Sequence, residues 1–424
     1  MESIQFGSPP PAPVRRRGES NADFEFRVIE HELLAHLPPH LEWRVHPVRI
    51  PRVFWSRGSA LAANARRAAF LDDGQRQDGD CWYTINTLDA RMRPMRGREP
   101  PTRLPRMLLL HAWSWGLPMW ISNMASFCES YQVHAIDLLG WGGSSRPPFH
   151  QLFHATPEAA QDFFIEAIEA WRRSVGLERF VLVGHSMGGH IAAAYYLRYP
   201  DAVSKLVLSS PIGLGGYQPR EAPNLAAAVR NALIHRVWVA TPHRLASLAG
   251  HGTLRRYVLT HLGNPDAPAF GDRSETRVRL VFEYVLASIH RGPGISGEAA
   301  FAVLGSPTRG WNLPLDTGLR AALTRRRRWT APVVIMYGEH DWIDPAYVLE
   351  HLWPAVHEAG RLHVYLVEGA KHHAYKENAA QFEAIVMWGE GGAAACGVRE
   401  APTLVGRRPA YARLGARIPD VHYT

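Results

Sequence analysis

Six short apolar runs recur along the chain, and each has the length of one strand; they lie at residues 107–110, 133–136, 180–183, 205–208, 333–337 and 362–367. Runs without alternating polar residues are typical of strands buried on both faces of a sheet. Helical patterns separate several of them, and one such pattern begins at Thr156, Pro157 and Glu158, which supply an N-cap, a first-turn proline and a first-turn acid. This alternation predicts an α/β fold with a mostly parallel central sheet flanked by helices.

A serine flanked by glycines follows the third run. Residues 184–188 read Gly-His-Ser-Met-Gly and lie between a predicted strand and a predicted helix. A serine hydroxyl is a weak nucleophile, so an enzyme must expose it and place a base beside it. Gly184 and Gly188 permit the sharp strand-to-helix turn that presents such a serine. We therefore predict that Ser186, next to His185, is a nucleophile; the alternative is a glycine-rich helix start without chemistry.

Attack by a serine also requires N–H donors for the oxyanion that forms. The backbone N–H of Met187, directly after the serine, is one predicted donor. The second is expected in the loop at residues 111–116, His-Ala-Trp-Ser-Trp-Gly, which follows the first apolar run. Ala112 stands where a glycine is common, so the Trp113 N–H is the candidate. The alternative is that Trp113 and Trp115 are apolar filler, or line the acyl pocket without a part in the chemistry.

The chain order of the remaining polar residues fits a serine hydrolase, in which an acid follows a late strand and a histidine follows the last strand. Asp341 follows the run at 333–337, and His372 follows the run at 362–367. We predict that Asp341 orients His372, and that His372 is the base. Asp344 is the alternative acid and His373 the alternative base. Together with the elbow serine, this order predicts the α/β-hydrolase fold.

The alternation of runs breaks between residues 213 and 330, where long helical patterns at 224–239 and 276–289 follow one another without strands. This break predicts an inserted helical cap. The chain ends differ in composition, with prolines and arginines near the start and glycine, alanine and arginine near the end. The predicted organisation is a disordered arm (1–30), a first core segment (31–212), the cap (213–330), a second core segment (331–390) and a flexible tail (391–424).

The chain carries a formal net charge of +8 over 424 residues, which favours an acidic partner. No recognised nucleic-acid motif is present, so we expect an anionic membrane or lipid-droplet surface and no nucleic acid. The three cysteines form no CxxC pair, and neither they nor the 22 histidines indicate a zinc site. We predict no metal and no cofactor. The sequence indicates no oligomeric state.

No apolar run approaches the roughly 18 residues that a membrane span requires, and the N-terminus lacks the apolar core of a secretory signal. We therefore expect an intracellular protein that is cytoplasmic or peripheral to membranes or lipid droplets. Three consecutive arginines at residues 15–17 keep a mitochondrial location open.

Four further motifs extend the pattern beyond the serine elbow; they lie at residues 137–147, 192–200, 296–301 and 337–342. With these motifs, residues 105–390 resemble a group of α/β hydrolases that contains phospholipid acyl hydrolases and lysophosphatidate acyltransferases, among them the yeast cardiolipin-specific deacylase and the animal lipid-droplet lipase coactivator. The resemblance implies that Ser186 is the nucleophile, Asp341 the acid and His372 the base. Some members carry asparagine at the serine position and act as coactivators, so Ser186 favours an active enzyme.

Three residues depart from the pattern of that group. Glu377 stands where an aspartate follows the base by five residues in members linked to acyl transfer, while Ala112 and Lys371 replace common glycines. The resemblance thus implies a serine hydrolase that cleaves fatty-acyl esters of glycerophospholipids or lysophospholipids through an acyl-enzyme on Ser186. The alternatives are a lysophosphatidate acyltransferase, a weakly active protein that binds lipid droplets or membranes, and a hydrolase of small soluble esters.

A run of four arginines lies near the end of the predicted cap, namely Arg325, Arg326, Arg327 and Arg328. Guanidinium groups bind phosphates in bidentate fashion, so this run is a candidate contact for lipid phosphates. The alternative is an ordinary solvated face.

Overall fold

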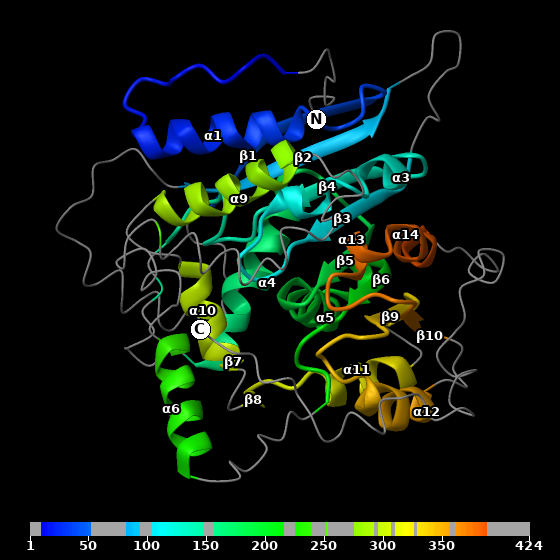
Figure 1. Ribbon diagram of the computed structural model, residues 1–424. Coiled ribbons are helices and arrows are strands. Elements are labelled where there is room, and N and C mark those ends of the chain that lie inside the picture. The colour runs from blue at the N-terminus through cyan, green and yellow to red at the C-terminus, as the bar shows by residue number, and fades with distance from the viewer. Residues whose placement is uncertain are drawn as a thin grey trace.

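The computed structural model of the protein describes residues 10–51, 82–93, 104–147, 149, 156–215, 225–239, 252, 275–291, 296–306, 310–325, 329–356 and 361–387. Figure 1 shows a twisted sheet through the centre of the molecule with helices packed around it.

Within these residues, one sheet contains eight strands in the order β1-β2-β4-β3-β5-β6-β9-β10. Their bounds are β1 Leu41–Pro51, β2 Trp82–Met92, β3 Arg106–Leu110, β4 Gln132–Ile136, β5 Phe180–His185, β6 Val203–Ser209, β9 Val333–Gly338 and β10 Leu362–Val367. Strand β2 pairs antiparallel with β1 and β4, and all other pairs are parallel. The predicted mostly parallel α/β sheet is confirmed.

All six apolar runs form parallel strands, from β3 to β10, and the sheet buries both of their faces. Strands β1 and β2 were not predicted. In β1 the sequence Leu-Glu-Trp-Arg-Val-His alternates apolar with polar residues, because this edge strand is buried on one face only.

The order of the strands places a crevice at the centre of the sheet. The chain runs from β3 to its neighbour β4 and then returns to the other side of β3 to form β5. The connections that leave β3 and β5 therefore depart in opposite directions, and such a switch point opens a crevice at the carboxyl ends of the two strands. The loop at residues 111–116 and Ser186 follow these two strand ends.

Helices cover the sheet on both faces (Figure 1). The longer ones are α1 Asn21–Leu34, α4 Pro157–Ser174, α5 Met187–Arg198, α6 Leu225–Val239, α9 Glu275–His290, α10 Ser296–Leu304, α11 Asp316–Thr324 and α14 Ala379–Met387. Shorter ones are η1 Leu117–Trp120, α3 Met124–Cys128, η2 Pro200–Ala202, η3 Val348–Leu352, α12 Trp353–Val356 and α13 Ala374–Glu377. Helix α4 begins as predicted, because the Thr156 hydroxyl accepts a 3.2 Å hydrogen bond from the Ala159 N–H.

In the region predicted as a cap, helices α6, α9, α10 and α11 are accompanied by two short paired strands, β7 Gly305–Ser306 and β8 Gly310–Trp311. Helices α6 and α9 coincide with the two long helical patterns in the sequence. The division of the chain into core and cap stays a prediction.

The predicted disordered arm, residues 1–30, is wrong for residues 21–30, because these residues form the first part of helix α1. The Ser20 hydroxyl caps the helix by accepting a 3.1 Å hydrogen bond from the Asp23 N–H. Asp23 also receives a 2.8 Å hydrogen bond from Arg291, at the end of α9, and the Phe26 ring packs on Tyr284. The predicted tail at residues 391–424 lies outside the described residues.

Candidate active site

Ser186 occupies a strained turn between β5 and α5. Its backbone has φ 54° and ψ −111°, a conformation that residues other than glycine adopt rarely. The flanking glycines make the turn possible, because a Cβ on Gly184 would overlap the Gly188 carbonyl, and a Cβ on Gly188 would overlap the Leu110 carbonyl at the end of β3. The turn therefore places the serine at the crevice between the carboxyl ends of β3 and β5.

Three polar side chains from distant parts of the chain form one hydrogen-bonded series. His372, in the loop after β10, places Nε2 at 3.1 Å from the Ser186 hydroxyl and Nδ1 at 2.9 Å from the Asp341 carboxylate. The Asp341 side chain, in the turn after β9, is fully buried. A carboxylate accepts only, so Nδ1 carries the hydrogen and Nε2 is free to accept the serine proton.

Neither alternative residue has a described hydrogen bond to this series, although the His373 ring lies 5.3 Å from the His372 ring. Asp344 is exposed, and its carboxylate accepts a 2.9 Å hydrogen bond from the Ala346 N–H. The His373 ring packs against Tyr375 at 5.8 Å and makes no described contact with Ser186. Desolvation lowers the pKa of His373 well below its ordinary value, so this ring is neutral at neutral pH. The geometry therefore brings Asp341 and His372, rather than Asp344 and His373, to the serine.

The two candidate oxyanion donors lie on adjoining segments. Met187 is the first residue of α5, where a backbone N–H has no partner within the helix. The Ala112 N–H donates to the Met119 sulfur at 3.4 Å, which leaves Trp113 as the next amide in the loop after β3. A Cβ on Gly188 would also overlap the His111 carbonyl, so this loop lies directly against the start of α5.

Comparison with known proteins identifies the family. The family model for the alpha/beta hydrolase fold matches residues 105–379. The chain belongs to the α/β-hydrolase family. The fold predicted from the elbow serine and from the order of serine, acid and histidine is thereby confirmed.

Relatives of this α/β hydrolase carry names from lipid chemistry. The (lyso)-N-acylphosphatidylethanolamine lipase of Bos taurus is 31% identical over 308 residues, which cover 69% of this chain and 79% of the relative. The 1-acylglycerol-3-phosphate O-acyltransferase ABHD5 of Sus scrofa is 33% identical over 252 residues, or 56% of this chain and 64% of the relative. These names agree with the resemblance that the sequence motifs indicate.

Solved structures agree on the fold. The carboxylesterase CesB of Bacillus subtilis superposes with a TM-score of 0.52 at 16% identity, covering 86% of this chain and 96% of that chain.

A buried carboxylate, missed in the sequence analysis, fixes the loop after β3 in this hydrolase. Asp137 Oδ1 accepts a 2.7 Å hydrogen bond from the Leu117 N–H, and Oδ2 accepts from the Gly143 N–H at 2.6 Å and from the Asn86 amide at 2.9 Å. The Tyr284 hydroxyl on α9 donates to the same carboxylate. Asp137 opens the motif at residues 137–147, which is the signal by which it could have been found.

The Asp137 network extends to helix α1. The Asn86 amide that donates to Asp137 also donates to the buried Glu30 carboxyl at 2.6 Å. Burial and the neighbouring Asp137 carboxylate raise the pKa of Glu30 to about 8. One amide group thus bridges two buried carboxyl groups, one on α1 and one that holds the candidate oxyanion loop.

His185, before the serine, forms a cluster of rings with His372. The two ring centroids are 4.8 Å apart, and His185 Nδ1 lies 3.1 Å from the Ser209 carbonyl oxygen. Burial lowers the pKa of His185 well below its ordinary value. The ring beside His372 is therefore neutral, so it does not oppose a positive charge on His372 by like-charge repulsion.

Aromatic side chains surround the candidate site. Trp113 stacks on Trp238 of α6 at a centroid distance of 5.6 Å, and Trp238 packs on Phe301 of α10. The Trp342 ring lies 4.9 Å from the His372 ring and is 70% exposed. Apolar surface of this kind suits a long-chain acyl group.

Of the four predicted phosphate-binding arginines, only Arg325 is described; it is exposed at the end of α11. Arg326, Arg327 and Arg328 lie outside the described residues.

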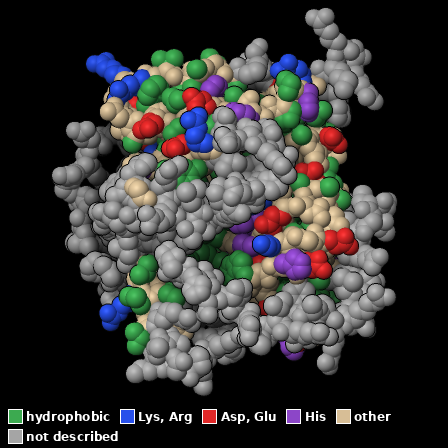
Figure 2. All heavy atoms as spheres, in the orientation of Figure 1, with side chains coloured by type: hydrophobic (Ala, Val, Ile, Leu, Met, Phe, Trp, Pro, Cys, Tyr) green, Lys and Arg blue, Asp and Glu red, His purple; other side chains and the backbone are tan. Residues whose placement is uncertain are grey.

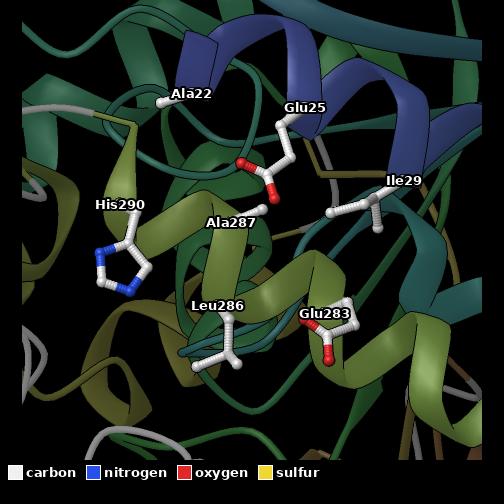
Figure 3. A pocket seen from close by; sticks show the side chains of 7 residues that line it. All are labelled: Ala22, Glu25, Ile29, Glu283, Leu286, Ala287 and His290. Atoms are coloured by element: carbon white, nitrogen blue, oxygen red, sulfur yellow. The ribbon is translucent and has the colours of Figure 1, made fainter. Parts of the chain in front are cut away.

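A separate pocket of about 300 Å³ lies between α1 and α9. Figure 3 shows the Glu25 side chain reaching from α1 toward α9, with Glu283 and His290 at its sides. None of the residues that line this pocket belongs to the Ser186 series.

Among the described residues, no helix is long and apolar enough to cross a membrane. Within the same part of the chain, no group of three or more histidine, cysteine or acidic residues could hold a metal ion.

Proposed function

We propose that this chain is a serine hydrolase that cleaves fatty-acyl esters of glycerophospholipids or lysophospholipids through an acyl-enzyme on Ser186. The observation that carries the proposal is the hydrogen-bonded series from Asp341 through His372 to Ser186. The order of the three residues in the chain matches the order found in α/β hydrolases.

In the proposed reaction, the Ser186 hydroxyl attacks the ester carbonyl carbon while His372 Nε2 takes its proton. The N–H groups of Met187 and Trp113 stabilise the oxyanion, and His372 then returns the proton to the leaving alcohol. Water attacks the acyl-enzyme in the same manner and releases the fatty acid. Asp341 holds the imidazole in the required tautomer and stabilises its positive charge.

Two observations support a lipid substrate. Several relatives are named for acyl-lipid substrates, including the bovine lipase and the porcine acyltransferase. The aromatic group formed by Trp113, Trp238 and Phe301 supplies apolar surface next to the loop that carries the candidate oxyanion donor. We therefore place the protein at the surface of membranes or lipid droplets, with Arg325 to Arg328 as candidate contacts for lipid phosphates.

The second candidate function is acyl transfer to a lysophospholipid, and it is favoured by the relatives named as acyltransferases. The same acyl-enzyme serves both reactions, with a lipid hydroxyl in place of water. Product analysis with lysophosphatidate and an acyl donor separates the two, because hydrolysis yields free fatty acid and transfer yields a diacylated lipid.

The proposal is tested by labelling with a fluorophosphonate probe, which reacts with an activated serine. We expect the wild-type protein to be labelled and the Ser186→Ala variant to remain unlabelled, and we expect lipid profiling of incubations to show products only with the wild type. Equal labelling of both proteins would refute Ser186 as the nucleophile. A folded wild-type protein that is not labelled, yet binds membranes, would favour a non-enzymatic interaction protein.

A further inference from the structure

Helix α6 presents an apolar stripe to the outside of the molecule. Val229, Leu233 and Val237 are 61%, 62% and 40% exposed. Residues spaced by four lie on one face of a helix, so the three side chains form a continuous row, here called the α6 stripe. Figure 1 shows α6 at the lower left, at the margin of the molecule, and Figure 2 shows hydrophobic side chains gathered there beside a basic one.

Trp238 of the same helix packs against the rest of the protein. Its indole N–H donates a 2.8 Å hydrogen bond to the Gly305 carbonyl oxygen, and its ring stacks on Trp113 and packs on Phe301. The helix is thus held by contacts next to the loop after β3. The α6 stripe is exposed on a helix that is anchored to the candidate site.

The charge beside the stripe indicates what it contacts. Arg236, between Leu233 and Val237 in sequence, is exposed, and the whole chain carries a net charge of +8. A helix with an apolar row and basic side chains beside it matches the chemistry of an anionic lipid surface, into which it inserts apolar groups while the cation meets phosphates.

We propose that the α6 stripe docks the protein on the surface of an anionic phospholipid bilayer. The inference rests on the proposed function, because an acyl-lipid substrate is held in a bilayer and the enzyme must bind there to reach it. Since Trp238 joins α6 to Trp113, docking through the stripe holds the candidate site close to the lipid that it would cleave.

Vesicle co-sedimentation of the full-length protein tests the inference. The probes are phosphatidylcholine vesicles with and without phosphatidylglycerol, and the variants are Leu233→Ser with Val237→Ser, and Arg236→Gln. Removing two inserted apolar groups is expected to weaken binding to the anionic vesicles by tenfold or more, and removing the cation by roughly fivefold. The matched control is Val14→Ser, because Val14 is 81% exposed and lies on another segment; its binding is expected to equal that of the wild type.

Labelling of Ser186 and hydrolysis of a soluble short-chain ester verify that each variant is folded, and both are expected to match the wild type. Wild-type binding by the double variant would overturn the inference, as would a wild-type protein that binds no vesicle. The inference would also fail if the α6 stripe joined two copies of the chain. In that case the wild type would be a dimer, the stripe variants would be monomers, and both would bind vesicles equally. The proposed function is judged separately, by Ser186-dependent hydrolysis of phospholipid dispersed in detergent.

Discussion

The Glu377 carboxylate accepts a 2.6 Å hydrogen bond from the backbone N–H of Lys371, and so closes the loop that carries His372. Two of the three residues that depart from the pattern of related hydrolases, Lys371 and Glu377, are thus partners of each other. The described hydrogen bonds of the His372 ring go to Asp341 and Ser186 and not to Glu377, so we infer that Glu377 positions the loop rather than taking part in the reaction.

Replacement of Glu377 by alanine is expected to lower kcat roughly three- to tenfold with little change in KM, because the loop loses one exposed hydrogen bond. Steady-state hydrolysis of a soluble ester measures both constants. Glu377→Gln keeps an acceptor oxygen and is expected to retain most of the activity. Unchanged kcat in the alanine variant would argue against a positioning role.

Replacement of Asp341 by asparagine is expected to lower kcat by about 10³–10⁴-fold, because the amide no longer favours the imidazole tautomer that accepts the serine proton. Asp344→Asn is the matched control, since Asp344 is an exposed turn residue three positions further on. Its kcat is expected to equal that of the wild type. A larger loss of kcat in the Asp344 variant than in the Asp341 variant would show that Asp344, and not Asp341, orients the histidine.

The positive φ of Ser186 predicts a gain of stability when the serine is replaced by glycine. Ser186→Gly relieves the backbone strain, whereas Ser186→Ala keeps it, so the glycine variant is expected to be more stable by about 1 kcal/mol. Both variants lack the serine hydroxyl and differ by a single methyl group, which makes them suitable for a direct comparison by thermal or urea unfolding. Equal stabilities would show that the turn is not strained.

The raised pKa of the buried Glu30 carboxyl group predicts that the stability of the protein depends on pH. Its pKa is raised to about 8 in the folded protein, while in the unfolded chain it lies near the usual value of about 4.3. Between these values the folded state holds a proton that the unfolded state has lost, so the free energy of unfolding falls as pH rises from about 4.3 to 8. Glu30→Gln imitates the protonated carboxyl group.

Urea unfolding at several pH values measures this effect. The Glu30→Gln variant is expected to lose less stability than the wild type between pH 5 and 8, and to be the more stable protein at the upper end. Parallel curves for the two proteins would mean that Glu30 does not titrate in this range.

The parts of the fold predicted from the sequence are those in which a local pattern decides the structure. The runs that became β3 to β10 are apolar on both faces, and the Ser186 turn needs glycines at fixed positions. Strand β2 was missed because Asn86, Thr87 and Asp89 are polar yet buried, and long-range partners satisfy them. The Asp137 network was missed for the same reason, since its donors come from Asn86, Leu117 and Tyr284, far apart in the chain.

The order of the site residues along the chain has a consequence for synthesis. The serine is made first, and its candidate base belongs to the loop after the last strand of the sheet. A nascent chain therefore carries the candidate nucleophile, Ser186, for nearly half of its length before His372 is made. The hydrogen-bonded series can form only after the last strand of the sheet has been made, so the reaction proposed for Ser186 has no base during most of translation.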